Sequence, residues 1–128
     1  MDKIRNDHAD IAPAIGNYVR SIKAGDMLFI SGCTAVGTEA ETGDVMAQAE
    51  ATLDRIKRIV EADGATTSDI VKMTIYVTDM AEFRTHLAEF DQLLERYFQG
   101  TYPTSTLVAS PGLARPSLLI EIEPTVVF

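Results

Sequence analysis

The segment IVKMTIYVT, residues 70–78, contains the strongest strand pattern in the sequence. Apolar and polar side chains alternate along it, and a period of two places the two sets on opposite faces of a β-sheet. The two sets are Val71, Met73, Ile75 and Val77 on one side, and Lys72, Thr74, Tyr76 and Thr78 on the other. We therefore predict a strand here with one face in the protein core.

Amphipathic helices are predicted before and after this strand. Before it, apolar residues recur at the helical spacings of three and four, at Met46, Ala49, Leu53, Ile56 and Val60. Charged residues, Arg55 among them, occupy the other faces, and Gly64 is a stop signal. After the strand, Asp79 is an N-cap candidate for a helix whose apolar face comprises Phe83, Leu87, Phe90, Leu94, Tyr97 and Phe98. Gly100 and Pro103 end this second helix.

Shorter strands complete the predicted order. Tyr18–Lys23 and Met27–Ser31 form a hairpin, with Gly25 in the turn. Ser105–Ala109 and Leu118–Glu123 follow the second helix. The order β-β-α-β-α-β-β predicts one α+β domain over residues 1–128, with both helices packed on one face of a mixed sheet.

The uncovered face of this sheet is expected to carry Thr74, Tyr76 and Thr106. A sheet that is covered on one side needs a partner on the other. A homo-oligomer whose sheets share an interior is the natural way to supply that partner.

The composition narrows the class of function. A net charge of −8 argues against electrostatic binding to nucleic acid or to an anionic membrane. Cys33 is the single cysteine, which fits a reducing compartment, and neither a signal peptide nor a membrane-spanning run is visible. Two isolated histidines, His8 in an exposed N-terminal segment and His86 on the second helix, do not make a metal site. We expect a soluble, cytoplasmic protein with no metal and no cofactor.

The ordered motifs resemble those of the Rid (YjgF-type) family of enamine/imine deaminases. Residues 15–18, IGNY, are similar to the family's Ile-Gly-Pro-Tyr, and residues 23–32, KAGDMLFISG, are similar to its Lys-x-Gly-Asp-x-x-Phe-x-Ser-Gly signature. Residues 47–49 and 70–80 resemble the start of the first helix and the central strand with its exit. In the C-terminal fifth, Pro103, Ser105 and the IEIE of residues 120–123 resemble the family's Pro-x-Arg-Ser-x-Val and Ile-Glu-Ile-Glu segments.

The resemblance implies a fold like that of Bacillus-type chorismate mutase, assembled as a homotrimer with three clefts between subunits. It implies that Tyr18 is the cleft tyrosine and that Glu121 is the acid. If the second helix, about one turn longer than usual, is aligned from its C-terminal end, Asp91 falls near a cleft asparagine. Thr106 takes a position that is often Cys, Thr or Ser, and Cys33 one where glutamine is common.

Thr104 is assigned to the position of the family's substrate-binding arginine. Threonine carries no charge and cannot replace a bidentate contact to a substrate carboxylate. Three explanations stay open: the substrate lacks that carboxylate or presents it elsewhere; Arg115, in the loop of residues 110–117, reaches into the cleft; or the protein binds a small ligand without turnover.

Imine hydrolysis requires a carboxylate that manages the attacking water. We expect Glu121 to do so, Tyr18 to line the pocket, and the backbone of Thr104, Ser105 and Thr106 to bind substrate oxygen. Cys33 is a weaker candidate, as a nucleophile or a pocket residue. The leading hypothesis is a cofactor-independent hydrolase or deaminase for an enamine, imine or related C–N metabolite, such as an amino-substituted ring-cleavage product. The alternative is a non-catalytic ligand-binding or stress-associated protein on the same trimeric scaffold.

Overall fold

A computed structural model describes residues 1–128, and its six strands form one mixed sheet in the order β1-β2-β3-β6-β4-β5. The strands are β1 (Lys3–Asn6), β2 (Ser21–Ala24), β3 (Met27–Ile30), β4 (Ile70–Val77), β5 (Thr104–Ala109) and β6 (Ile120–Val127). Only β4 and β5 are parallel to each other, and every other neighbouring pair is antiparallel. No helix is long and apolar enough to cross a bilayer.

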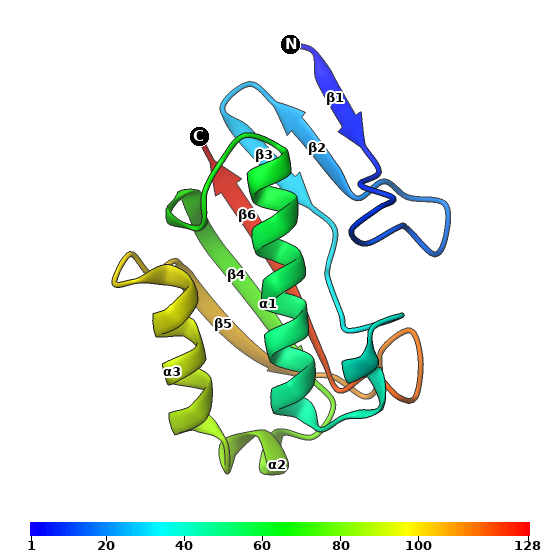
Figure 1. Ribbon diagram of the computed structural model, residues 1–128, viewed down its shortest axis with the longest axis vertical. Coiled ribbons are helices and arrows are strands. Elements are labelled where there is room, and N and C mark those ends of the chain that lie inside the picture. The colour runs from blue at the N-terminus through cyan, green and yellow to red at the C-terminus, as the bar shows by residue number, and fades with distance from the viewer.

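The helices cover one face of this sheet. The α-helices are α1 (Val45–Ala62), α2 (Met80–Arg84) and α3 (Leu87–Phe98), and short 3₁₀ turns occupy Glu39–Thr42 and Thr67–Asp69. In Figure 1, α1 and α3 lie side by side in front of the strands. The predicted α+β class, with helices on one face of a mixed sheet, is therefore confirmed.

Local sequence explains where α1 begins. The Asp44 carboxylate accepts a hydrogen bond of 2.8 Å from the backbone N–H of Ala47, which caps the free amides of the first turn. The buried face of α1 includes Leu53, Ile56 and Val60, which join the central core with side chains of β4 and β6. This packing places β6 beneath α1, and β6 carries Glu121.

The N-terminal strand β1 was not predicted. It pairs antiparallel with β2, yet all four of its side chains are exposed, so no apolar alternation marks it. His8, expected to be exposed, is buried. Its Nε2 lies 2.9 Å from the Asp63 carboxylate and 3.2 Å from the Ser21 hydroxyl. This contact ties the N-terminal segment to the end of α1.

The second predicted helix is two helices. Asp79 caps α2, as expected, but the chain leaves helical geometry between Thr85 and His86 before α3 begins. The element order thus gains one strand at the start and one helix break. Arg55 also differs from expectation, because it is buried and donates a 2.8 Å hydrogen bond to the Thr34 carbonyl.

Strand boundaries shift by a few residues. A bulge between Ile70 and Lys72 leaves Val71 exposed and Ile70 buried in its place. β6 extends to Val127, and β2 starts at Ser21, so Tyr18 lies in a loop and not in a strand. The hairpin turn is as predicted, with Gly25 at a φ of +60°.

The face of the sheet opposite the helices is uncovered. Thr74 and Tyr76 lie there, half-buried, and Thr106 is exposed beside Thr74 on the edge strand β5, as predicted. Met27 and Phe29 of β3 pair with Val127 and Thr125 of β6 on the same face, and Phe29 is 47% exposed. A band of apolar side chains therefore remains open to a partner.

Candidate active site

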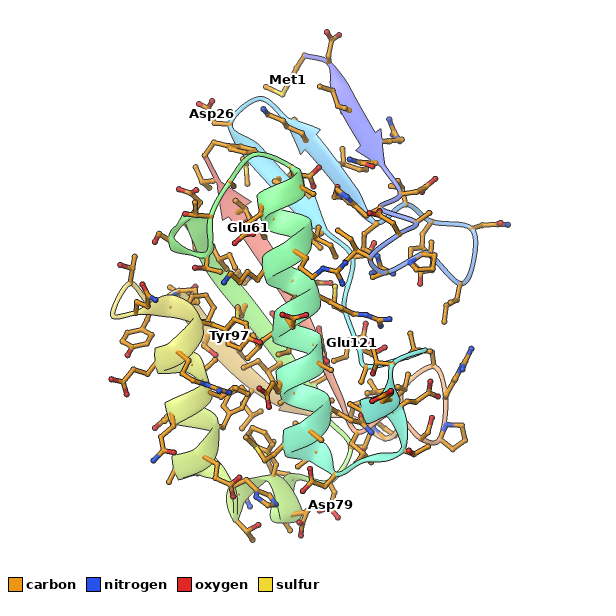
Figure 2. All side chains as sticks on the ribbon, in the orientation of Figure 1. Met1, Asp26, Glu61, Asp79, Tyr97 and Glu121 are labelled. Carbon is orange, nitrogen blue, oxygen red and sulfur yellow. The ribbon has the colours of Figure 1, made fainter.

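A hollow of about 370 Å³ lies where the N-terminal loop, the segment after β3, β6 and the loop before β6 meet. Its wall includes four of the predicted site residues, Tyr18, Cys33, Arg115 and Glu121. Residues from both ends of the chain thus meet at one place. In Figure 2, Glu121 lies on the opposite side of α1 from Tyr97.

Glu121 is half-buried on β6, next to Gly32. A Cβ atom on Gly32 would overlap the Glu121 Oε2, so glycine is the residue that allows this carboxylate to lie against the backbone. Burial raises the pKa of Glu121, the negative charge of Glu123 raises it further, and Arg20 opposes both. A carboxyl group with a raised pKa is suited to exchange protons with a substrate.

Arg20 is a site residue that the sequence did not reveal. Its side chain is buried, its Nε donates to the Ala12 carbonyl at 2.7 Å, and its Nη1 donates to the Gly32 carbonyl at 2.9 Å. The guanidinium also lies 5.7 Å from the centre of the Tyr18 ring. Arg20 therefore organises both Tyr18 and the backbone beside Glu121. A single arginine before a short strand belongs to no motif, so nothing in the sequence marked it.

Tyr18 is 46% exposed at the rim of the hollow. Its hydroxyl oxygen accepts a hydrogen bond of 3.3 Å from the backbone N–H of Ile15, which leaves its own O–H free to donate. Tyr18 also lines a neighbouring groove with Phe29 and Glu123, at the edge of the uncovered sheet face. It thus stands between the hollow and that open face.

Cys33 lies in the wall of the hollow but is only 2% exposed. Burial raises the pKa of its thiol to about 11, although Arg20 and Arg55 act in the opposite direction. The sulfur contacts the Ser31 carbonyl at 3.5 Å. At neutral pH Cys33 is a packed thiol, and the thiolate that a nucleophile needs is suppressed.

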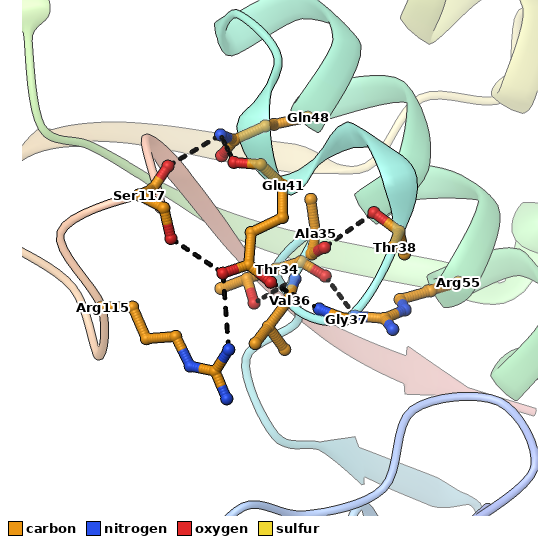
Figure 3. Close-up of polar contacts among 10 residues, drawn as sticks. All are labelled: Thr34, Ala35, Val36, Gly37, Thr38, Glu41, Gln48, Arg55, Arg115 and Ser117. Carbon is orange, nitrogen blue, oxygen red and sulfur yellow. Dashed lines mark hydrogen bonds and ion pairs between the residues drawn. The ribbon is translucent and has the colours of Figure 1, made fainter.

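Arg115 reaches the hollow from the loop before β6. Its Nη1 lies 3.4 Å from the Glu41 carboxylate, which also accepts hydrogen bonds from the Ser117 hydroxyl at 2.8 Å and the Gly37 N–H at 2.7 Å. Figure 3 shows the three donors converging on Glu41. Gln48 donates to the Ser117 carbonyl at 2.9 Å and so holds the loop from the α1 side.

The remaining predicted residues lie outside this hollow. Asp91 and Ser105 line a separate groove between α3 and β5, together with Phe98. The Thr104 hydroxyl donates to the Val71 carbonyl at 2.9 Å, and Thr106 lies on the uncovered sheet face. One chain therefore brings Glu121, Tyr18, Arg115 and Cys33 together and keeps the β5 residues apart from them.

The assignment of Thr104 to the arginine position needs correction. In Pro-x-Arg-Ser-x-Val the arginine stands two residues after the proline, and two residues after Pro103 is Ser105. Because β5 side chains alternate, Ser105 points to the same side as Met73, and Thr104 to the opposite side with Lys72. Neither position carries an arginine, so we still expect β5 to lack the bidentate arginine contact to a substrate carboxylate.

The largest groove of the chain lies elsewhere, and no metal site accompanies the Glu121 hollow. A wider groove of about 600 Å³ between α1 and α3 is lined by Glu50, Glu89 and Glu95 and contains none of the predicted residues. No group of three or more His, Cys, Asp or Glu side chains is arranged to hold a metal ion. The arrangement around Glu121 offers one proton-exchanging carboxyl group among guanidinium groups and main-chain carbonyls.

Comparisons with known proteins agree on the family. The family model described as Endoribonuclease L-PSP matches residues 9–128. The 2-iminobutanoate/2-iminopropanoate deaminase of Escherichia coli is 38% identical over 112 residues, which cover 86% of each chain.

Solved structures show the same fold. E. coli TdcF with bound serine superposes with a TM-score of 0.83 at 34% identity and covers 98% of both chains. RidA from the Antarctic bacterium Psychrobacter gives a TM-score of 0.82 at 29% identity, over 98% of this chain and 100% of that one.

Proposed function

The chain belongs to the Endoribonuclease L-PSP family, the Rid (YjgF-type) family, and we propose that it is a deaminase that hydrolyses a reactive imine or enamine to a carbonyl compound and ammonia. One observation carries the proposal. The half-buried Glu121 carboxyl, with its raised pKa, lies in the wall of a hollow that also contains Tyr18 and Arg115. A relative of 38% identity bears the name of an imine deaminase, which supports the same reaction.

Glu121 alone suffices for the proton transfers. Protonated Glu121 gives its proton to the enamine carbon or the imine nitrogen, which yields an iminium ion. The resulting carboxylate takes a proton from a water as the water oxygen bonds to the iminium carbon. Glu121 then protonates the nitrogen of the carbinolamine, the C–N bond breaks, and the carboxylate recovers a proton from the new carbonyl oxygen. One water is consumed and one ammonia is released, so no cofactor is required.

Tyr18 serves as a donor at the rim of this hollow. Its free O–H is available to the attacking water or to a substrate oxygen, because its lone pair already accepts from Ile15. The backbone of Thr104–Thr106 is proposed to bind substrate oxygen from the edge strand β5.

A homotrimer would complete the site between subunits. Two features support this: the band of apolar side chains on the uncovered sheet face, and the separation of Asp91 and Ser105 from the Glu121 hollow within one chain. A neighbouring chain is needed to bring a β5 edge to that hollow. Light scattering should give three times the mass of one chain, and a monomer would contradict the shared cleft.

The substrate is proposed to be a small molecule and not RNA. The family description names an endoribonuclease, but a chain with a net charge of −8 lacks the positive surface that phosphate backbones require. The missing arginine on β5 favours a substrate that presents its carboxylate elsewhere, as an amino-substituted ring-cleavage product does. TdcF binds serine, which is also a small molecule with a carboxylate.

The test is ammonia release from freshly generated imino acids and aminomuconate-type compounds. Glu121→Gln should lower kcat by about 10²- to 10⁴-fold. Glu61→Gln is the control, since Glu61 is an exposed carboxylate outside the hollow, and it should stay within a few-fold of wild type. If wild type and Glu121→Gln both remain at background on every substrate, the non-catalytic binding function replaces this one.

A further inference from the structure

Positive charge gathers around the Glu121 hollow. Its wall includes three arginines, Arg20, Arg55 and Arg115, but only one carboxylate, Glu121. This excess lies in a chain whose net charge is −8. An acidic protein that concentrates guanidinium groups around one hollow is arranged to attract an anion to it.

Two of these arginines are already committed to the protein. Arg20 donates to the carbonyls of Ala12 and Gly32, and Arg55 donates to the carbonyl of Thr34. Both side chains are buried. They supply positive potential to the hollow, but they are held in place by hydrogen bonds to main-chain carbonyls.

Arg115 is the arginine that remains available. Its side chain is 51% exposed, and its one ion pair, with Glu41, is long at 3.4 Å. A guanidinium has five N–H donors in a planar fork, so most of those of Arg115 are unused. Such a fork matches the two oxygens of a carboxylate.

Glu41 can release Arg115 without losing its own support. The Glu41 carboxylate keeps the Gly37 N–H at 2.7 Å and the Ser117 hydroxyl at 2.8 Å, both shorter contacts than the one to Arg115. Ser117 also fixes the loop two residues beyond Arg115 (Figure 3). The loop is therefore anchored independently of the guanidinium.

We propose that Arg115 binds the carboxylate of an anionic substrate in the hollow beside Glu121, and so takes over the role of the arginine that is missing from β5. The proposal rests on the proposed deaminase function and assigns its substrate class, an imine or enamine that bears a carboxylate. The substrate carboxylate displaces Glu41 from the Arg115 guanidinium. This contact directs the C–N group of the substrate toward Glu121.

Equilibrium binding tests this assignment without turnover. The probes are 2-oxobutanoate, a stable oxo acid, and its neutral amide, each titrated by calorimetry into the intact protein. Wild type should bind the acid at least 10-fold more tightly than the amide. Arg115→Gln should lose about 10- to 100-fold in affinity for the acid and nothing for the amide, and Arg115→Lys should lose less.

Arg96→Gln is the matched control, because Arg96 is an exposed arginine paired with Glu50 at 3.2 Å outside the hollow. It should bind both probes as wild type does, and unfolding midpoints in urea should confirm that every variant is folded. Equal affinity of wild type and Arg115→Gln for the acid would overturn the proposal, as would an equal loss for acid and amide or no binding of the acid by wild type.

The two proposals fail separately. If Arg115→Gln binds the acid normally while Glu121→Gln abolishes ammonia release, the deaminase function stands and the role of Arg115 is refuted. If binding of the acid depends on Arg115 but no substrate is deaminated, the carboxylate-binding site is supported and the deaminase function is refuted.

Discussion

Gly32 lies so close to Glu121 that a methyl group on Gly32 would occupy the space of the Glu121 Oε2 and crowd its Cδ and Cγ. The contact joins the segment after β3 to the start of β6, two parts of the chain that are 89 residues apart. It fixes where the carboxylate points and brings it into the field of Arg20, whose guanidinium donates to the Gly32 carbonyl.

Gly32→Ala should therefore displace the Glu121 carboxylate and reduce kcat for imine hydrolysis by about 10²-fold, since small misplacements of a catalytic group cost this much. Gly112→Ala is the control, because nothing lies within 4 Å of an added Cβ there. Steady-state ammonia release from both variants checks this. Unchanged activity of Gly32→Ala would show that the position of Glu121 is not critical.

The pH dependence should follow the charge on Glu123. Burial and the Glu123 carboxylate raise the pKa of Glu121, so the high-pH limb of kcat/KM, where activity is lost, should lie above the usual range of a carboxyl group. Activity falls as the pH rises through this pKa, because Glu121 must be protonated to give its proton to the substrate. Glu123→Gln removes one of the charges that raise this pKa, so the limb should move to lower pH. Profiles from pH 4 to 8 measure it, and a limb that stays in place would contradict the assignment to Glu121.

His8 should contribute to stability and His86 should not. His8→Ala removes buried contacts to Asp63 and Ser21 and should lower the free energy of unfolding by about 1–3 kcal/mol. His86→Ala removes only exposed contacts to Glu82 and Glu89 and should change it by about 0.5 kcal/mol or less. Urea unfolding at pH 7 compares the two. A change of about 0.5 kcal/mol or less for His8→Ala would mean that the buried contacts of His8 give no net stabilisation.

An arginine returned to β5 should substitute for Arg115. In the Arg115→Gln background, Ser105→Arg should restore about 10-fold or more of the lost kcat/KM on a carboxylate-bearing imine, because Ser105 holds the motif position. Thr104→Arg should not, since residue 104 points to the other side of the strand and loses its bond to Val71. Rescue by Thr104→Arg alone would show that residue 104, and not residue 105, holds the arginine position.

Much of the fold was predictable because its signals are local. The alternation in residues 70–78, the helical spacing from Met46 to Val60 and the turn at Gly25 each reflect the geometry of consecutive residues. The same holds for the motif that singled out Glu121. Where a boundary was wrong, a local irregularity was the cause, as with the bulge that exposes Val71.

The sequence by itself determined the α+β class, the family and Glu121 as the candidate acid, since periodicity and ordered motifs are read along the chain. Only the tertiary structure decided that His8 is buried against Asp63, that Arg20 organises the site, and that Arg115 rather than a β5 residue shares a hollow with Glu121. Those relationships join residues that are far apart in sequence, and their positions follow from how α1 and the loops pack on the sheet.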